Sequence, residues 1–437
     1  MKQILVIGSG AREHVIGETL KRSQQDVKLF YFGNSKNPGL VKLCEKYEIG
    51  KLDDFENIKK FALENKIDFA VCGPEAPLAA GITDYLLEAG IRVVGPNKKL
   101  AQLESSKSFT RDLLDKNNIK GNPLYKNFFD NNGLKEYIGS FKGNYVIKAD
   151  GLKGGKGVKV SGDHLFSDEE GYKYALECLR DEGKVVVEEK LIGQEFSLMS
   201  FCDGTTVIDM PAVQDHKRAY DKDKGPNTGG MGSYSDANHL LPFLTSKDID
   251  EAHHISESVA NAIKTELGEY YKGILYGGFI ATKNGVSLIE YNARFGDPEA
   301  MNVLPLLETD FVLVCEAILD GNLDKINVNF RNKAMVCKYA VPRGYPDNPI
   351  RGTKISLDKI PAEAGLYFAS VDEKEDGLYL GGSRAIAIVA EGDNIFEAED
   401  KCEDAIKLIE GPVFHRSDIG TESMINEKVR MMEKLRS

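Results

Sequence analysis

The first hundred residues alternate short apolar runs with amphipathic stretches. Uninterrupted apolar runs of this kind are typical of parallel strands that are covered on both faces. We therefore expect strands at 4–7, 27–32, 69–72 and 92–94, with helices after the first and third of them. Alternating strands and helices predict a doubly wound parallel sheet, whose ligands lie at the carboxyl ends of the strands. Turns at 8–14 and 73–78 fall at such ends.

The middle of the chain changes to paired strands and long loops. We expect helices at 103–114, 255–267 and 311–319, and strands at 145–148, 158–160, 184–189, 196–202, 277–281 and 286–289. Lys283-Asn284-Gly285 is a good turn signal, so the last two strands should form a hairpin. Residues 211–234 are polar, glycine-rich and without periodicity, and such long segments in compact domains are usually functional or disordered.

The end of the central hairpin carries the first candidate chemistry. Glu290, Asn292 and Arg294 are spaced by two residues, which places them on one face of an extended strand. Their carboxylate and amide oxygens suit a hard cation such as Mg²⁺, and the guanidinium suits a phosphate or carboxylate. The alternative is a strand with an ordinary polar outer face.

The last hundred residues predict a small α+β domain. Strands are expected at 334–341, 365–371, 377–380 and 384–391, followed by a helix at 395–409. The whole chain should therefore combine α/β and α+β architecture. We place its domains at 1–105, 106–330 and 331–437.

The composition narrows the class of protein. The 437 residues are 42% hydrophobic and 28% charged, which is typical of a globular protein with sizeable cores. A net charge of −12 argues against nucleic-acid or membrane binding through bulk charge. The seven cysteines show no paired spacing and no apolar run reaches 18 residues, so we expect a cytoplasmic protein with reduced thiols.

Two glycine-rich turns suggest anion binding, although neither fits a standard nucleotide motif. The turn at 8–14 has Glu13 where a dinucleotide fingerprint needs its third glycine, and the second strand ends at Asn34 without an acidic residue. This argues against a dehydrogenase, whereas the free backbone N–H groups and the dipole at the helix N-terminus still favour a bound anion. The loop at 151–157 contains four glycines and two lysines between strands, but no P-loop motif.

His216 has no second His or Cys nearby, which favours a hydrogen-bonding role over metal ligation.

Taken together, these residues resemble the ATP-grasp ligases. Lys107, Lys148, the loop at 151–157, the strand exit at 188–195 and the Glu290-x-Asn292 pair occur in the order and spacing of that superfamily. Longer motifs are similar to the glycinamide ribonucleotide synthetase family (phosphoribosylamine–glycine ligases), and they lie at 8–14, 73–78, 214–218, 225–232 and 294–299. The chain departs from the family pattern at Ala11 and Asp236, and the strand at 274–282 lacks a third metal-ligating acid.

The resemblance implies a central ATP-grasp fold, with a lid subdomain at about 121–192. The implied reaction is ligation of glycine to 5-phosphoribosylamine through glycyl phosphate, with ATP as co-substrate and Mg²⁺ or Mn²⁺ as the metal. The product, glycinamide ribonucleotide, belongs to purine biosynthesis, and a monomer or homodimer is expected. The alternatives are another ATP-grasp carboxylate–amine ligase, a carboxylase, or a non-catalytic nucleotide-binding protein. A biotin-type Met-Lys-Met is absent from the sequence.

The resemblance also assigns roles to individual residues. The metal ligands would be Glu290 and Asn292. The catalytic residues would be Arg294, Lys148 and Asp215. ATP would be bound by Lys107, Lys148, Gly154, Gly155, Lys156, Gly157, Glu188, Glu189, Leu191 and Glu195. The other substrates would be bound by Gly10, Arg12, Glu13, His14, Gly73, Pro74, Glu75, Asp215, Lys217, Asn227, Thr228, Gly229, Arg294, Asp297 and Pro298.

Overall fold

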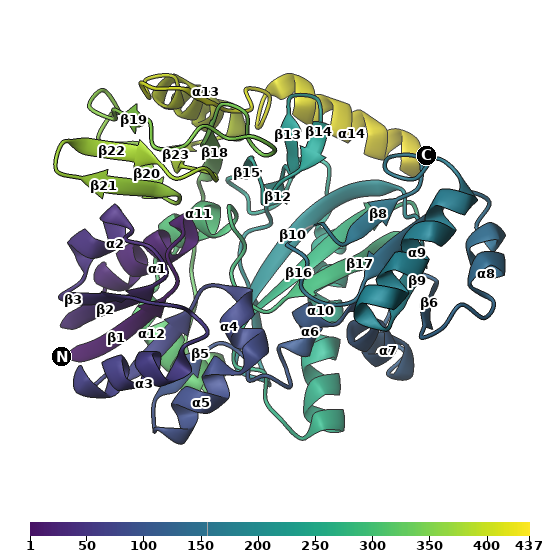
Figure 1. Cartoon of the computed structure of the whole chain (residues 1–437), viewed down its shortest axis with the longest axis horizontal. Coiled ribbons are helices and arrows are strands. Elements are labelled where there is room, and N and C mark those ends of the chain that lie inside the picture. Colours follow the sequence, from purple (N-terminus) through teal and green to yellow (C-terminus); the bar gives the residue numbers. More distant parts are fainter. Residues whose placement is uncertain (155) are drawn as a thin grey trace.

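The computed structural model describes residues 1–154 and 156–437, which form several sheets accompanied by helices (Figure 1). The N-terminal sheet is parallel, with strand order β3-β2-β1-β4-β5. Its strands are β1 (Lys2–Ile7), β2 (Val27–Gly33), β3 (Lys46–Ile49), β4 (Phe69–Cys72) and β5 (Arg92–Val94). Its helices are α1 (Ala11–Lys21), α2 (Pro38–Leu43), α3 (Phe55–Glu64), α4 (Glu75–Ala80) and α5 (Ile82–Glu88).

The doubly wound prediction is confirmed, with two differences in detail. The sequence pattern did not indicate β3, an edge strand whose residues are mostly exposed and which therefore lacks an apolar run. The single helix expected after β4 is divided into α4 and α5 at Gly81, whose backbone adopts a left-handed conformation (φ +105°). The helix expected at 103–114 is likewise divided, at Ser106, into α6 (Gln102–Ser105) and α7 (Lys107–Lys116).

A small antiparallel sheet, with strand order β6-β9-β7-β8, lies within the segment 121–192 that was predicted to be a lid. Its strands are β6 (Tyr125–Phe128), β7 (Tyr145–Ala149), β8 (Val158–Val160) and β9 (Val185–Glu189), accompanied by helices α8 (Leu134–Ser140) and α9 (Asp168–Glu182). The glycine-rich loop joins β7 to β8, as the sequence predicted. This sheet has its own apolar core, separate from that of the central sheet.

The central sheet is antiparallel, with strand order β11-β10-β16-β17. Its strands are β10 (Gly193–Cys202), β11 (Val207–Asp209), β16 (Gly273–Thr282) and β17 (Gly285–Asn292). The predicted hairpin is confirmed as β16–β17. Helix α10 (Ser246–Leu267), which begins nine residues before its predicted start at 255, packs against β16 and β17. The chain continues through α11 (Ala300–Val303), η1 (Leu304–Leu306), α12 (Phe311–Asp320) and η2 (Leu323–Lys325).

A third large sheet crosses the domain boundary expected at residue 331. Its strand order is β12-β15-β18-β23-β20, and β24 pairs with β18. Its first two strands, β12 (Gln214–Asp215) and β15 (Gly232–Ser235), come from the polar segment 211–234, which has no strand periodicity. The remaining strands are β18 (Ala334–Pro342), β20 (Gly365–Phe368), β23 (Ile386–Gly392) and β24 (Val413–Phe414).

Smaller elements complete the C-terminal part. They are β13 (Arg218–Tyr220), β14 (Lys224–Asn227), β19 (Lys354–Ile355), β21 (Val371–Lys374), β22 (Gly377–Leu380), α13 (Ile395–Ile406) and α14 (Glu422–Arg436). The strand expected at 365–371 is therefore two strands, β20 and β21. Helix α14 was not predicted, and it packs against β10 and β16, which are distant from it along the chain.

Candidate active site

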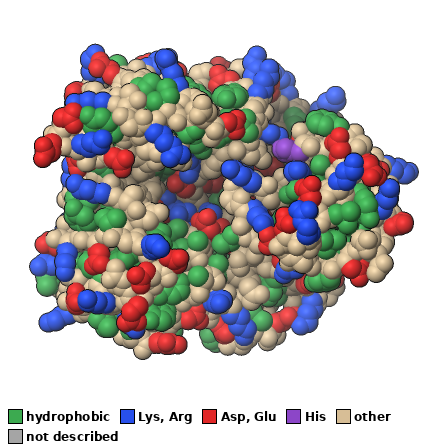
Figure 2. All heavy atoms as spheres, viewed as in Figure 1, with side chains coloured by type: hydrophobic (Ala, Val, Ile, Leu, Met, Phe, Trp, Pro, Cys, Tyr) green, Lys and Arg blue, Asp and Glu red, His purple; other side chains and the backbone are tan. Residues whose placement is uncertain are grey.

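A cleft of about 680 Å³ lies where all three large sheets meet. Figure 2 shows the hollow near the centre of this face, with acidic and basic side chains inside it. The N-terminal domain contributes Arg12 and Glu75, and β7 contributes Lys148. The C-terminal part contributes Arg384, which lies two residues before β23. The cleft is thus lined by side chains from parts of the chain that are distant in sequence.

A β-bulge decides which way the metal-binding candidates point. Gly278 pairs with Glu290 and Phe279 pairs with Leu288, so Ile289 is an extra residue in β17. Without it, Glu290 would share a face with buried Val286 and Leu288, because side chains alternate along a strand. The bulge reverses this alternation and turns Glu290 and Asn292 into the cleft. Glu290, Asn292 and Arg294, which were predicted to share one face of a strand, all line the cleft.

Glu290 remains ionised although its side chain is only partly exposed to solvent. Burial acts to raise the pKa of its carboxyl, but nearby positive charges, foremost Lys217, outweigh burial and lower it. The Lys217 ammonium lies 3.9 Å from the Glu290 carboxylate. Within residues 1–154 and 156–437, no three His, Cys, Asp or Glu side chains form a metal cluster. A metal at this place would therefore rely on one carboxylate, one amide oxygen and oxygens from its ligand.

Lys148 occupies a buried ionic cluster at the join between lid and central sheet. Its ammonium lies 2.8 Å from the Glu188 carboxylate and donates to the carbonyl oxygen of Ile289 at 2.8 Å. Arg111, which is buried in α7, holds both oxygens of Glu188 at 2.6 and 2.9 Å. Burial lowers the pKa of Lys148, although Glu188 opposes this shift. Glu188 is thus saturated by cations, while Lys148 still lines the cleft.

The glycine-rich loop contributes to the rim of the cleft. The Lys107 ammonium donates to the carbonyl oxygen of Gly151 at 2.6 Å, which ties the first turn of α7 to the start of the loop. Gly154 and Gly157 line the cleft, whereas Lys156 is exposed and does not. Gly155, also expected to bind ATP, lies outside the described residues.

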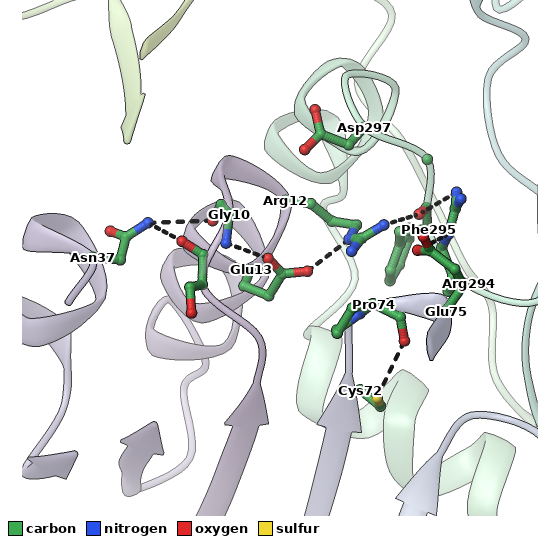
Figure 3. A network of polar contacts seen from close by, with 12 residues as sticks. Gly10, Arg12, Glu13, Asn37, Cys72, Pro74, Glu75, Arg294, Phe295 and Asp297 are labelled. Carbon is green, nitrogen blue, oxygen red and sulfur yellow. Dashed lines mark hydrogen bonds and ion pairs between the residues drawn. The ribbon is translucent and has the colours of Figure 1, made fainter. Parts of the chain in front are cut away.

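Arg294 belongs to an ionic network shared with the N-terminal domain (Figure 3). Its guanidinium lies 2.9 Å from Glu104 and 3.4 Å from Glu75. Burial acts to lower the pKa of Arg294, but these two carboxylates outweigh it and raise the pKa. Arg12 donates to the carbonyl oxygen of Phe295 at 3.2 Å, beside the same network. The network fixes the end of β17 against the turns at 8–14 and 73–78.

Asp215 and Glu299 form an acidic pair on the floor of the cleft. Burial raises the pKa of Asp215 well above its usual value, and the charge of Glu299 raises it further. Glu299 accepts a hydrogen bond from the Tyr276 hydroxyl at 2.7 Å. Lys217 lies close enough that these acids, with Glu290 and Glu195, raise its pKa despite the opposing effect of burial. A carboxyl group with a raised pKa therefore lies beside a positively charged lysine.

Arg384 joins the C-terminal part to the glycine-rich segment. Its guanidinium donates to the carbonyl oxygens of Gly229 at 2.8 Å and Gly230 at 3.0 Å, and lies 3.0 Å from Asp297. Asp297 also accepts a hydrogen bond from the Tyr339 hydroxyl at 2.7 Å. Asp297, Gly229 and their neighbours Asn227 and Thr228 line the cleft, as expected for substrate-binding residues.

Other candidates support the walls instead of lining the cleft. His14 is buried, accepts a hydrogen bond from the Phe368 amide at 3.1 Å and stacks on the Phe368 ring. Glu13 accepts from the Gly10 amide at 2.5 Å and from Arg12 at 2.7 Å, so it caps α1. Glu189 accepts from the Leu124 amide. The remaining candidates that are absent from the cleft lining are Gly10, Gly73, Pro74, Leu191 and Pro298.

Several cleft residues escaped the sequence analysis. Arg384 lies two residues before β23, and Tyr276 lies in β16 just before the strand expected at 277–281. No local pattern indicated that either residue lines the cleft. Glu104 lies in a segment that was read as an ordinary helix start. Glu299 did have a signal, because it closes the motif at 294–299. Lys428 belongs to α14, which the sequence pattern did not indicate.

Comparison with known proteins identifies the family. Models of the phosphoribosylglycinamide synthetase N domain, ATP-grasp (A) domain and C domain match residues 2–104, 105–300 and 335–422. The chain belongs to the phosphoribosylglycinamide synthetase family. Helix α14 lies almost wholly beyond the C-domain match, which ends at residue 422.

Relatives and solved structures of this family cover nearly the whole chain. The phosphoribosylamine–glycine ligase of Methanocaldococcus jannaschii is 49% identical over 99% of this chain and 100% of the relative. That of Methanobrevibacter smithii is 48% identical over 99% of each chain. The crystal structure of the Thermotoga maritima phosphoribosylamine–glycine ligase superposes with a TM-score of 0.81 at 29% identity, covering 95% of this chain and 100% of that one. The three-domain ATP-grasp architecture predicted from sequence is thereby confirmed.

No helix in the described part of the chain combines the length and apolar character needed to cross a membrane.

Proposed function

We propose that this protein ligates glycine to 5-phosphoribosylamine with ATP, giving glycinamide ribonucleotide, ADP and phosphate in purine biosynthesis. The observation that carries the proposal is the composition of one cleft. The lysine and metal-binding candidates of the ATP-grasp core line the same cleft as the Arg294–Glu75 and Asp297–Arg384 ion pairs. The names of relatives that match the full length of the chain support the same reaction.

The proposed chemistry explains why a phosphate-binding core is combined with amine and carboxylate sites. A free carboxylate does not react with an amine, because oxide is a very poor leaving group. One glycine carboxylate oxygen attacks the γ-phosphorus and ADP departs. The amine of phosphoribosylamine then attacks the glycyl carbonyl carbon, phosphate departs and the amine loses a proton. The protein contributes positioning and charge neutralisation, as in phosphoryl transfer generally.

The lid side of the cleft is the proposed nucleotide side. Lys107 and Lys148 supply positive charge for phosphates, and the loop at 151–157 covers them and excludes water from the acyl phosphate. Glu290 and Asn292 fit Mg²⁺ or Mn²⁺, because Mg²⁺ typically takes one or two carboxylates together with substrate phosphates. When bound, the metal neutralises charge on the phosphates.

The opposite side is the proposed site of glycine and phosphoribosylamine. Arg294, held by Glu104 and Glu75, offers a guanidinium to the glycine carboxylate or the transferring phosphoryl group. The raised pKa of Asp215 suits it to accept the proton that the attacking amine releases. Arg12, at the turn 8–14, offers a cation to the ribose phosphate.

Seven free cysteines support a cytoplasmic location, and we propose a monomer or homodimer.

Measuring ADP release with defined co-substrates tests the proposal. We expect release only when ATP, glycine and phosphoribosylamine are present together. Bicarbonate-dependent release without glycine would instead indicate a carboxylase, and binding of ATP without any turnover would indicate a non-catalytic protein. Mass-spectrometric detection of glycinamide ribonucleotide identifies the product directly.

A further inference from the structure

Helix α14 places a lysine on its packed face. Ile425 and Met432 are buried in the central core, and Val429 packs against it. Lys428 lies three residues after Ile425 and four before Met432, so it shares their face of the helix. Burying a charged side chain on the packed face of a helix costs free energy unless the charge reaches a polar site. Lys428 does so, because it lines the cleft.

The C-terminal end of α14 is fixed to the central sheet. The Arg436 guanidinium binds both oxygens of Asp248, at 2.6 and 3.0 Å, and donates to the carbonyl oxygen of Thr282 at 3.3 Å. The Gln194 amide lies 2.7 Å from the Met431 sulfur. These contacts hold the helix beside the start of β10, and Lys428 is therefore presented next to Glu195 at a defined place.

His216 is a second polar side chain that lines the same cleft. Its ring is 2% exposed, and neither ring nitrogen has a hydrogen-bond partner among the described residues. Burial, reinforced by the charges of Lys428 and Arg416, lowers the pKa of His216 well below its usual value. The ring is therefore neutral at pH 7, with one nitrogen that donates and one that accepts.

Lys428 likewise has no ion pair within the part of the chain that the structure describes. Burial lowers the pKa of its ammonium, while the nearby carboxylates of Asp223 and Glu195 act to raise it. Glu195 is exposed in the cleft and offers only acceptors. The three side chains together thus offer an ammonium, a neutral imidazole and a carboxylate.

We propose that Lys428 and His216, together with Glu195, bind the ribose hydroxyls of ATP, so that α14 completes the nucleotide site. A hydroxyl both donates and accepts, and it therefore matches this mixture of donors and acceptors. A phosphate offers acceptors alone and would be repelled by Glu195 and Asp223. The inference rests on the proposed function in taking ATP as the nucleotide. It makes Lys428 a specificity-determining residue outside the part of the chain that the family models match.

Comparing ATP with 2′,3′-dideoxy-ATP in the Lys428→Met variant tests this assignment. Methionine keeps the stem of the side chain and its packing on β10, while it removes the ammonium. We expect the affinity for ATP to fall about tenfold, the scale of one hydrogen bond to a charged group, with the affinity for the dideoxy nucleotide nearly unchanged. His216→Phe should act in the same direction. Arg430→Met, on the exposed side of α14, is the matched control and should leave both affinities unchanged.

Binding is measured by calorimetry without glycine or phosphoribosylamine, so the result does not depend on the ligation reaction. An equal loss of affinity for both nucleotides, or no loss for either, would overturn the assignment, as would the same loss in Arg430→Met. A thermal unfolding temperature matching that of the parent shows that Lys428→Met has not disturbed the fold. Failure of the proposed function appears separately, as ATP binding with normal ribose discrimination but no ligation.

Discussion

At the scale of single residues, the Glu290→Gln substitution distinguishes metal binding from folding, because it exchanges only one carboxylate oxygen for an amide nitrogen. The side chain takes part in no backbone hydrogen bond that the structure records, and its nearest ion partner, Lys217, is 3.9 Å away. Its negative charge is maintained against burial by the surrounding cations. The residue is therefore positioned to hold a cation without contributing much to stability.

We expect Glu290→Gln to lose turnover by about 10²-fold or more, because a preorganised charge is removed from the reacting phosphates. The thermal unfolding temperature should stay within a few degrees of the parent. ADP release at saturating ATP and glycine measures the first quantity and calorimetry the second. Glu169→Gln, at an exposed position of α9 outside the cleft lining, is a matched control that should keep full activity. Near-normal turnover in Glu290→Gln would remove this residue from the metal site.

At the scale of elements, one buried cluster connects the lid to the central sheet. Arg111 of α7 and Lys148 of β7 share Glu188 of β9, and both donate to the carbonyl oxygen of Ile289. The bulge in β17 makes that carbonyl available, because the extra residue is left out of the strand ladder. The same irregularity that directs Glu290 into the cleft also joins the two sheets.

We expect Lys148→Ala to reduce ATP-dependent turnover by about 10²-fold, through loss of a cation facing the phosphates. The fold should persist, because Arg111 still neutralises Glu188. Arg111→Ala is the contrasting variant. It leaves Glu188 with one partner in a buried place and should lower the free energy of unfolding by about 3 kcal/mol or more. Equal thermal stability of the two variants would contradict this division of roles.

At the scale of the molecule, His14 is a contact between the N-terminal domain and the C-terminal part. Its ring accepts from the Phe368 amide and packs between Phe368 and Tyr367. Burial, with the charge of Lys42, lowers the pKa of His14 to about 4. The docked arrangement therefore requires a neutral ring.

This contact predicts a loss of stability in mild acid. An unfolded histidine takes up a proton near pH 6.5, whereas the folded one does so only near pH 4, so protons favour unfolding between these values. The contribution of His14 is complete above about pH 6.5 and is lost as the pH falls to about 4, by up to about 3 kcal/mol. Urea unfolding at pH 7.5 and 5 should show a smaller decrease for His14→Gln than for the parent. Identical decreases would show that His14 does not titrate in this way.

The local patterns in the chain were enough for much of the fold and for the chemistry of the site. Apolar runs predicted β1, β2, β4 and β5, because a strand that is buried on both faces needs apolar residues at successive positions, whatever its place in the sheet. The motifs at 8–14, 73–78 and 290–299 identified residue types suited to phosphates, a cation and a carboxylate, because those preferences belong to the side chains themselves.

Only the tertiary structure decided which side chains share the cleft. His14 belongs to the motif at 8–14, but its ring contacts the C-terminal part of the chain and does not line the cleft, because β20 lies against α1. Arg384 and Lys428 carry no local signal, and their positions follow from strand pairing and from the packing of α14 across long sequence separations. The direction of Glu290 depends on a bulge that exists only when β16 pairs with β17. A side chain's chemistry is local, whereas its neighbours are set by contacts between distant segments.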